Sequence, residues 1–187
     1  MKKVLLIAIT AVGLVGCSGT LNISNQLDSY QSQNYTKVDS SILLGDFTYE
    51  PAQQGRLKES QLENTAVGTI YLDRSVAEIV KQITAKELQL TGINIGTGNL
   101  KLLGNVKQFK MDDLGYSVDF IYTINYKLMK NNSVIWDRDY SPKRVTVSKF
   151  ESHPQMMITN QIYRMVGAGY DKFINDTGVK QLLETNK

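Results

Sequence analysis

A long run of strict alternation between apolar and polar residues is the feature that most constrains the fold of this chain. The apolar members of the run are Tyr116, Val118, Phe120, Tyr122, Ile124, Tyr126 and Leu128. A period of two is typical of a strand that buries one face and leaves the other in water, as in antiparallel sheets. A slip of one residue would bury Asp119 and Asn125 together, so the register is strongly specified. We therefore predict that Phe120 and Tyr122 point into the core.

The other face of this strand is polar. The candidate partner-binding residues on it are Asp119, Thr123, Asn125 and Lys127. We expect helices to cover the apolar face, which leaves the polar face open to solvent or to a partner. Asp137 and Asp139 flank Arg138 on a later strand, so both acids should share one face while Arg138 takes the other. We interpret that pair as a solvated strand face, or as charges that blunt a sheet edge.

Two helices are predicted from apolar residues at helical spacing. The first covers residues 75–90 and opens with the Ser and Glu spacing of a capping box. The second begins at Pro154, which suits a first helical turn, and ends at residues 177–178, before a frayed tail. Gly167 and Gly169 lie inside it, where each glycine costs about 1 kcal/mol relative to alanine. Close packing of this helix on the sheet would explain them.

Three further strands and some shorter extended pieces complete the order of elements. The strands are expected over 38–49, 100–111 and 133–140, with extended pieces at 69–72 and 143–150. The order is therefore β-α-β-β-β-α. We predict an α+β fold in which an antiparallel sheet of about four strands carries two helices packed on one face.

The first residues have the layout of a secretory signal. A positive start is followed by an apolar stretch over 4–12, which is too short to span a bilayer, since a spanning helix needs about 20 residues. Leu14-Val15-Gly16-Cys17 then resembles the lipobox of bacterial lipoproteins. The resemblance implies cleavage before Cys17, a diacylglyceryl group on its sulfur and an acyl group on its new amine. Several acyl chains give stable anchoring. The alternative is a plain signal peptide with a chance cysteine.

This interpretation divides the chain into three parts. Residues 1–16 form a cleaved signal peptide, residues 17–36 a lipidated flexible tether, and residues 37–187 a single α+β periplasmic domain. The tether is rich in Ser, Asn and Gln, a composition too polar to bury a core. In enteric-type sorting an Asp after the cysteine favours retention in the inner membrane. Ser18 therefore points to the outer membrane, with the domain facing the periplasm.

Composition argues against several classes of activity. The 21 basic residues include Lys2 and Lys3 of the signal peptide, so 19 remain against 18 acidic ones and nothing points to nucleic acid. His153 is the only histidine and Cys17 the only cysteine, so we expect no metal site and no catalytic residues. The glycines at 96–98 precede a strand rather than a helix, which argues against a dinucleotide loop. We expect that the protein is not an enzyme and that it carries no cofactor beyond the diacylglycerol and N-acyl lipid on Cys17.

Three stretches resemble the YajG-type family of bacterial lipoproteins. They read LDRSVAEIVKQITAKELQLTG, GYSVDFIYTINYKLMKNNSVIWDRDY and YDKFIND. The family has no established catalytic residues, so the resemblance implies an outer-membrane lipoprotein and no particular site. The order of elements is also similar, at the level of the fold, to the lipoproteins LptE and PqiC. Function does not follow from fold.

Two functions follow as expectations. The first is a non-catalytic accessory or assembly module that binds another envelope protein through the open sheet face or a strand edge. The alternative is a carrier or transport auxiliary for lipid or lipopolysaccharide. That alternative requires an apolar cavity between sheet and helices, or an exposed basic patch. The candidate residues for such a patch are Lys101, Lys107, Lys110, Lys143 and Arg144.

Overall fold

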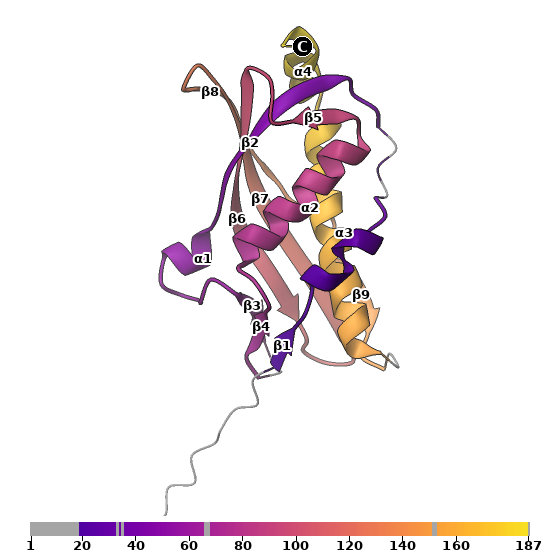
Figure 1. Cartoon of the computed structure of the whole chain (residues 1–187). Coiled ribbons are helices and arrows are strands. Elements are labelled where there is room, and N and C mark those ends of the chain that lie inside the picture. Colours follow the sequence, from indigo (N-terminus) through magenta and orange to yellow (C-terminus); the bar gives the residue numbers. More distant parts are fainter. Residues whose placement is uncertain (1–18, 33, 35, 66–67, 151–152, 187) are drawn as a thin grey trace, which may run out of the picture.

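The computed structural model describes residues 19–32, 34, 36–65, 68–150 and 153–186. The strands are β1 (Gly19–Leu21), β2 (Ser40–Tyr49), β3 (Gln61–Asn64), β4 (Ile70–Leu72), β5 (Ile93–Ile95), β6 (Leu100–Asp112), β7 (Ser117–Lys130), β8 (Ser133–Tyr140) and β9 (Val145–Ser148). The helices are the 3-10 helix η1 (Ser24–Ser29), α1 (Glu50–Gln53), α2 (Val76–Leu90), α3 (Pro154–Ile174) and α4 (Thr177–Thr185). A long twisted sheet forms one layer, and α2 and α3 pack side by side across one of its faces (Figure 1).

Strands β6 and β7 form the spine of the sheet. They pair antiparallel along almost their whole length, from Leu100 opposite Lys130 to Asp112 opposite Asp119. The outer edge of β6 is shared by β2 and β3, both parallel to it, and β5, β4 and β1 extend the sheet further. The outer edge of β7 is shared by β8 and β9, both antiparallel to it.

The predicted fold class is wrong. In place of an antiparallel sheet of about four strands with two helices, the described residues form a mixed sheet of nine strands with four α-helices. The strands expected from the sequence are present as β2, β6, β7 and β8, but β2 runs parallel to β6. The cause is α2, which lies between β2 and β6 in the chain, because a helical crossover returns the next strand in the same direction. Five of the strands have only three or four residues, too few for a clear pattern.

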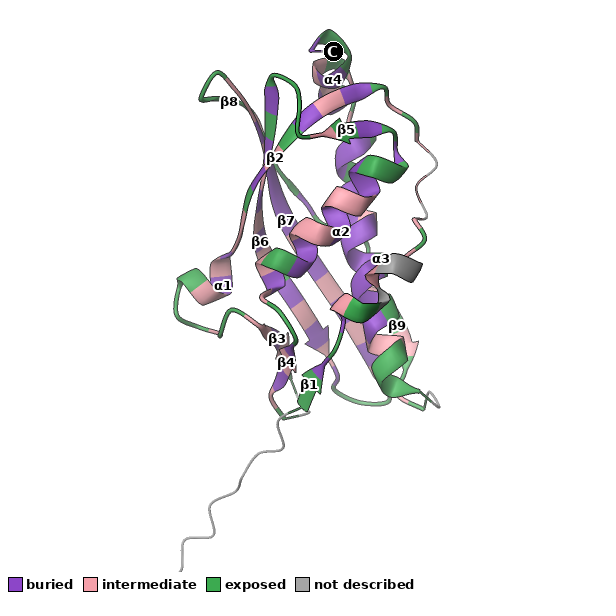
Figure 2. Ribbon diagram, in the orientation of Figure 1, coloured by how far each residue is buried: buried purple, intermediate pink, exposed green. Residues whose placement is uncertain are grey.

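The register predicted for β7 is confirmed from Val118 onwards, whereas Tyr116 lies before the strand and is exposed. Its alternate residues from Val118 to Leu128 are all buried, with Phe120 1% and Tyr122 2% exposed. The ring centroid of Tyr126 lies 4.8 Å from that of Phe173 on α3, and its hydroxyl lies 3.0 Å from the Thr84 hydroxyl on α2. The core therefore lies between the sheet and both long helices (Figure 2).

Close packing explains the glycines of α3. A Cβ atom on Gly169 would lie 2.6 Å from a ring carbon of Tyr122, so only glycine lets the helix approach β7 this closely. The predicted start of α3 at Pro154 and the Ser75 cap of α2 are both confirmed. The prediction of a frayed tail after this helix is wrong. Residues 177–185 form α4, which Asp176 caps by accepting the Gly178 N–H at 3.0 Å and which buries Val179 and Leu183.

Candidate functional site

The predicted lipidation site, Cys17, lies outside the described residues, and its acylation stays a prediction. The described chain begins two residues later, and β1 is already part of the sheet. The Gly19 N–H donates to the Thr69 carbonyl, and the Leu21 carbonyl accepts from the Asp73 N–H, both at 3.0 Å. The Asp73 carboxylate in turn accepts the N–H groups of Ile23 and Ser24, both at 3.1 Å. Burial alone would raise the pKa of Asp73, but hydrogen bonds from Ser24 and Ile23 outweigh it and lower the pKa.

A buried carboxylate holds the next part of this segment. Glu87 of α2 is fully buried and accepts hydrogen bonds from the Tyr30 hydroxyl and, at 2.5 Å, from the Ser32 hydroxyl. We call these three residues the Glu87 cluster. Burial raises the pKa of Glu87, although the bonds from Ser32 and Tyr30 act in the opposite direction. Burial and the bond to Glu87 likewise raise the pKa of Tyr30, so its hydroxyl stays a donor.

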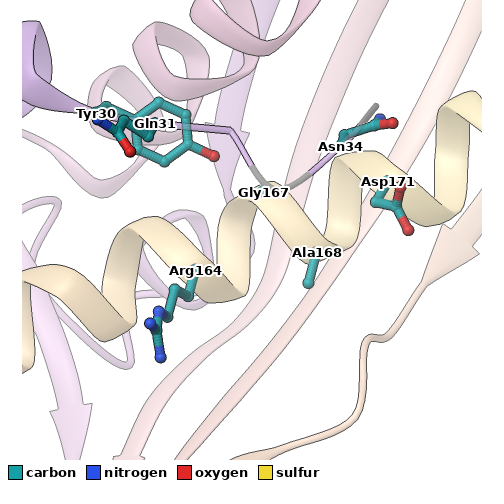
Figure 3. Close-up of a pocket in the computed structure, with 7 residues that line it drawn as sticks. All are labelled: Tyr30, Gln31, Asn34, Arg164, Gly167, Ala168 and Asp171. Carbon is teal, nitrogen blue, oxygen red and sulfur yellow. The ribbon is translucent and has the colours of Figure 1, made fainter. Parts of the chain in front are cut away.

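Helix α3 closes over the Glu87 cluster at Gly167. A Cβ atom at this position would lie 2.4 Å from the Tyr30 hydroxyl and 2.9 Å from Oε1 of Glu87. Beside it is a cleft of about 210 Å³ between the N-terminal segment and α3 (Figure 3). The cleft is lined by Tyr30, Gln31, Asn34, Arg164, Gly167, Ala168 and Asp171. The arrangement fastens the N-terminal segment to both long helices.

This packing differs from the flexible tether expected over residues 17–36. The segment buries few apolar side chains, but each of them fits the domain: Ile23 is 1% exposed, and the ring of Tyr30 lies 5.4 Å from that of Tyr163. Average composition does not reveal such isolated contacts. One signal was present in the sequence, because Glu87 falls four residues after Ile83, on the apolar face of its helix. A carboxylate in that place requires a buried partner.

The four candidate partner-binding residues lie on the outer face of β7 among charged neighbours, and Asp119, Thr123 and Lys127 are partly exposed there. The Asp119 carboxylate accepts from Thr146 at 2.5 Å and from Arg144 at 3.0 Å, and these bonds lower its pKa. The Thr123 hydroxyl donates to Gln108 at 3.0 Å. Lys127 pairs with Asp137 at 3.0 Å.

Asn125 departs from the prediction because it is 7% exposed rather than open to solvent. Its amide donates to Asp137 and to Asp139, at 2.7 Å each. Asp139 also accepts from Lys107 at 2.7 Å, so one continuous polar network crosses β6, β7 and β8. We call this network, with Lys127, the outer-face network. Hydrogen bonds from Asn125 and Lys127 lower the pKa of Asp137, and the bond to Asp139 raises that of Lys107.

The predicted separation of Arg138 from its two acidic neighbours is confirmed. Arg138 points to the other face, where it pairs with Asp176 at 2.8 Å and lies 4.7 Å from the ring of Trp136. Of the candidate basic patch, Lys107 and Arg144 are paired with carboxylates of the outer face. Charges of both signs therefore alternate on this face.

Within the described ranges, no group of three or more His, Cys, Asp and Glu side chains is placed to hold a metal. His153 lies at the N-cap position of α3, directly before Pro154. Among the described helices, none is long and apolar enough to cross a membrane.

Comparisons with known proteins identify the fold and no more. No protein-family model and no curated protein matches the chain. The chain is similar to XCC0632 from Xanthomonas campestris, described as DUF330, with a TM-score of 0.59, 9% identity, and 90% of this chain and 99% of that one covered. It is also similar to CT253, a hypothetical protein from Chlamydia trachomatis, at a TM-score of 0.44 and 6% identity, covering 74% of this chain and 99% of that one. It is similar as well to a minor lipoprotein from Acinetobacter baumannii, at a TM-score of 0.40 and 9% identity, covering 80% of this chain and 93% of that one.

The first of these similarities shows a shared fold over most of both chains. The other two have lower scores and add nothing to that argument. Because no family model matches, the YajG-type resemblance stays a prediction. The functional argument therefore depends on this chain's own residues.

Proposed function

We propose that this protein is a lipoprotein anchored through Cys17 in the outer membrane, and that it acts in the periplasm without catalysis. It serves there as an accessory or assembly module that binds another envelope protein. The single observation that carries the proposal is the outer-face network, which lies on the long strands of a sheet whose other face is covered by helices.

The outer-face network suits protein recognition. Asp137, Asp139, Lys107 and Lys127 are held in position by Asn125 and by one another, so a partner meets charges that are already arranged. Alternating charges at a contact surface favour one orientation and one partner over others. Ion pairs this exposed contribute little to the stability of the fold. A partner can therefore rearrange them on binding with only a small loss of folding free energy.

The interior supports protein binding over lipid carriage. The space between sheet and helices is filled by large side chains that are at most 2% exposed, Phe109, Tyr122, Tyr126, Tyr170 and Phe173 among them. The rings of Phe109 and Tyr122 meet edge to face at 6.2 Å. A carrier of acyl chains needs an apolar cavity, whereas these buried rings occupy the space between the sheet and the helices.

The anchor is tested by Cys17→Ala. The wild-type protein should label with palmitate and fractionate with the outer membrane, and the variant should do neither. A variant that still labels and still sediments with membranes would contradict the anchor.

The partner surface is tested by photo-crosslinking in intact cells. A crosslinker at Thr123 should capture one defined envelope protein, whereas one at Lys81, on the outward side of α2, should not. Charge reversal at Asp119 together with Lys127 should abolish the capture from Thr123. Reversal of Lys81 is the matched control and should leave it unchanged. Equal capture from both surfaces, or capture that survives the double reversal, would contradict this docking face.

A further inference from the structure

One end of the molecule presents large apolar side chains to solvent. Tyr116 is 84% exposed, Phe150 80%, Leu114 65% and Met156 54%. We call these four residues the terminal apolar patch. They are the four most exposed large apolar residues of the described chain, and they come from the β6–β7 turn, the turn after β9 and the first turn of α3. Clustered exposed apolar residues mark a surface that binds something.

The terminal apolar patch is held in place from beneath. The rings of Tyr116 and Phe150 stack with centroids 6.5 Å apart and an angle of 26° between planes. The Lys149 N–H donates to the Tyr116 carbonyl at 3.2 Å, and the Lys149 ammonium donates to the Asp113 carbonyl. The two segments are thus joined by hydrogen bonds next to the stacked rings.

The strand pairing places the start of the described chain at the same end. Gly19 is opposite Ile70 at the start of β4, the β3–β4 connection begins at Thr65, and the Thr65 hydroxyl lies 2.8 Å from the Asp113 carboxylate in the β6–β7 turn. Figure 1 shows β1, this turn and the first turn of α3 together at the lower end, and Figure 2 shows exposed residues there. Four strand spacings separate β1 from β7, roughly 19 Å.

We propose that the terminal apolar patch inserts into the leaflet that holds the lipid on Cys17, so that the domain sits directly on the membrane in one orientation. The proposal rests on the acylation of Cys17 proposed above. Gly19 follows Cys17 by two positions, so the two Cα atoms are at most about 7 Å apart. Since Gly19 is fixed in the sheet, acyl chains on Cys17 bring this end of the domain to the bilayer.

The chemistry of the patch fits the headgroup region of a bilayer. Tyrosine combines an apolar ring with a polar hydroxyl, and aromatic side chains are enriched where hydrocarbon meets water. The acidic neighbours in the turn are partly satisfied, because the Thr65 hydroxyl is within hydrogen-bond distance of Asp112 and Asp113, at 2.9 and 2.8 Å. In this orientation α4 and the β7–β8 turn point away from the membrane (Figure 1).

Site-directed fluorescence in lipid vesicles tests the proposal. Acylation consumes the thiol of Cys17, so a cysteine introduced by Leu114→Cys can be labelled alone with an environment-sensitive dye. Val134→Cys is the matched control, because Val134 is a 51% exposed apolar residue on β8, near the turn at the far end. The acylated full chain is reconstituted in phosphatidylethanolamine and phosphatidylglycerol vesicles that contain spin-labelled quencher lipids.

Quenching at position 114 should be several-fold stronger than at position 134, with a blue-shifted emission. The further variant Tyr116→Ser with Phe150→Ser should abolish the difference while palmitate labelling and the far-ultraviolet spectrum stay unchanged. Equal, weak quenching at both positions in an acylated, vesicle-bound protein would overturn the insertion and leave the anchor intact. A chain that neither labels with palmitate nor binds vesicles would overturn the anchor itself.

Discussion

Strand β7 and the N-terminal segment from Gly19 to Thr36 pack against the same two helices by opposite means. β7 buries every second side chain from Val118 to Leu128, so its contacts are dense, regular and apolar. The described residues of the N-terminal segment use two buried apolar residues and hydrogen bonds to Asp73 and Glu87. A regular pattern can be recognised from the sequence alone, whereas single contacts show only when both partners are in place.

The largest expected effect is at the centre of the regular pattern. Phe120→Ala should lower the free energy of unfolding by about 3–5 kcal/mol, because it removes a 1% exposed ring from beneath the helices and leaves a cavity. Chemical denaturation measures the change. A loss below about 1 kcal/mol would mean that β7 does not organise the core.

Ile23→Ala tests the sparse contacts in the same way. Ile23 is 1% exposed, and its carbonyl accepts from the Tyr163 hydroxyl at 2.5 Å, so the segment is fixed from two sides. We expect a loss of about 2–4 kcal/mol, somewhat less than at Phe120. Asn22→Ala, at an exposed neighbouring position, is the control and should be nearly neutral. If both variants unfold like the wild type, the segment is the free tether that its composition suggests.

These two regions also show how far the sequence could predict the structure. The register of β7, the cap of α2 and the start of α3 each depend on neighbours within a few residues, so they could be predicted. The direction of β2 depends on where α2 returns the chain, and the burial of Glu87 depends on Tyr30 and Ser32, more than 50 residues away. The polar face of β7 was predicted, but the burial of Asn125 was not, because it arises from Asp137 and Asp139 on the adjacent strand.

The Glu87 cluster should give the N-terminal segment a loss of stability as pH rises, opposite in sign to the trend expected from Asp119 on β7. Burial raises the pKa of Glu87 in the folded state, and the Asp171 charge adds to that rise. A folded state with a raised carboxyl pKa binds the proton more tightly than the unfolded chain, so stability is lost as pH rises from the ordinary glutamate range through the raised pKa. Glu87→Gln stays neutral and lacks this loss.

The stability of the wild type relative to Glu87→Gln should therefore be highest near pH 4 and should fall towards neutral pH. Comparing the two proteins cancels the opposite trend of Asp73, Asp119 and Asp137, whose pKa values are lowered. Thermal melts across this range provide the measurement. A difference that is constant with pH would show that Glu87 keeps its ordinary pKa.

The smallest expected effect on stability is at Asp119, on the outer face of β7, next in sequence to Phe120. Asp119 is the immediate neighbour of Phe120 but points to the open side, where it pairs with a 67% exposed Arg144 side chain. Exposed ion pairs contribute about 0.2–1 kcal/mol, so Asp119→Ala should cost about 0.5 kcal/mol or less. The loss should shrink further in high salt, because salt screens the pair, whereas the loss at Phe120 should not. Similar losses at both positions would mean that the two faces of β7 are equally buried, which would remove the open surface on which partner binding depends.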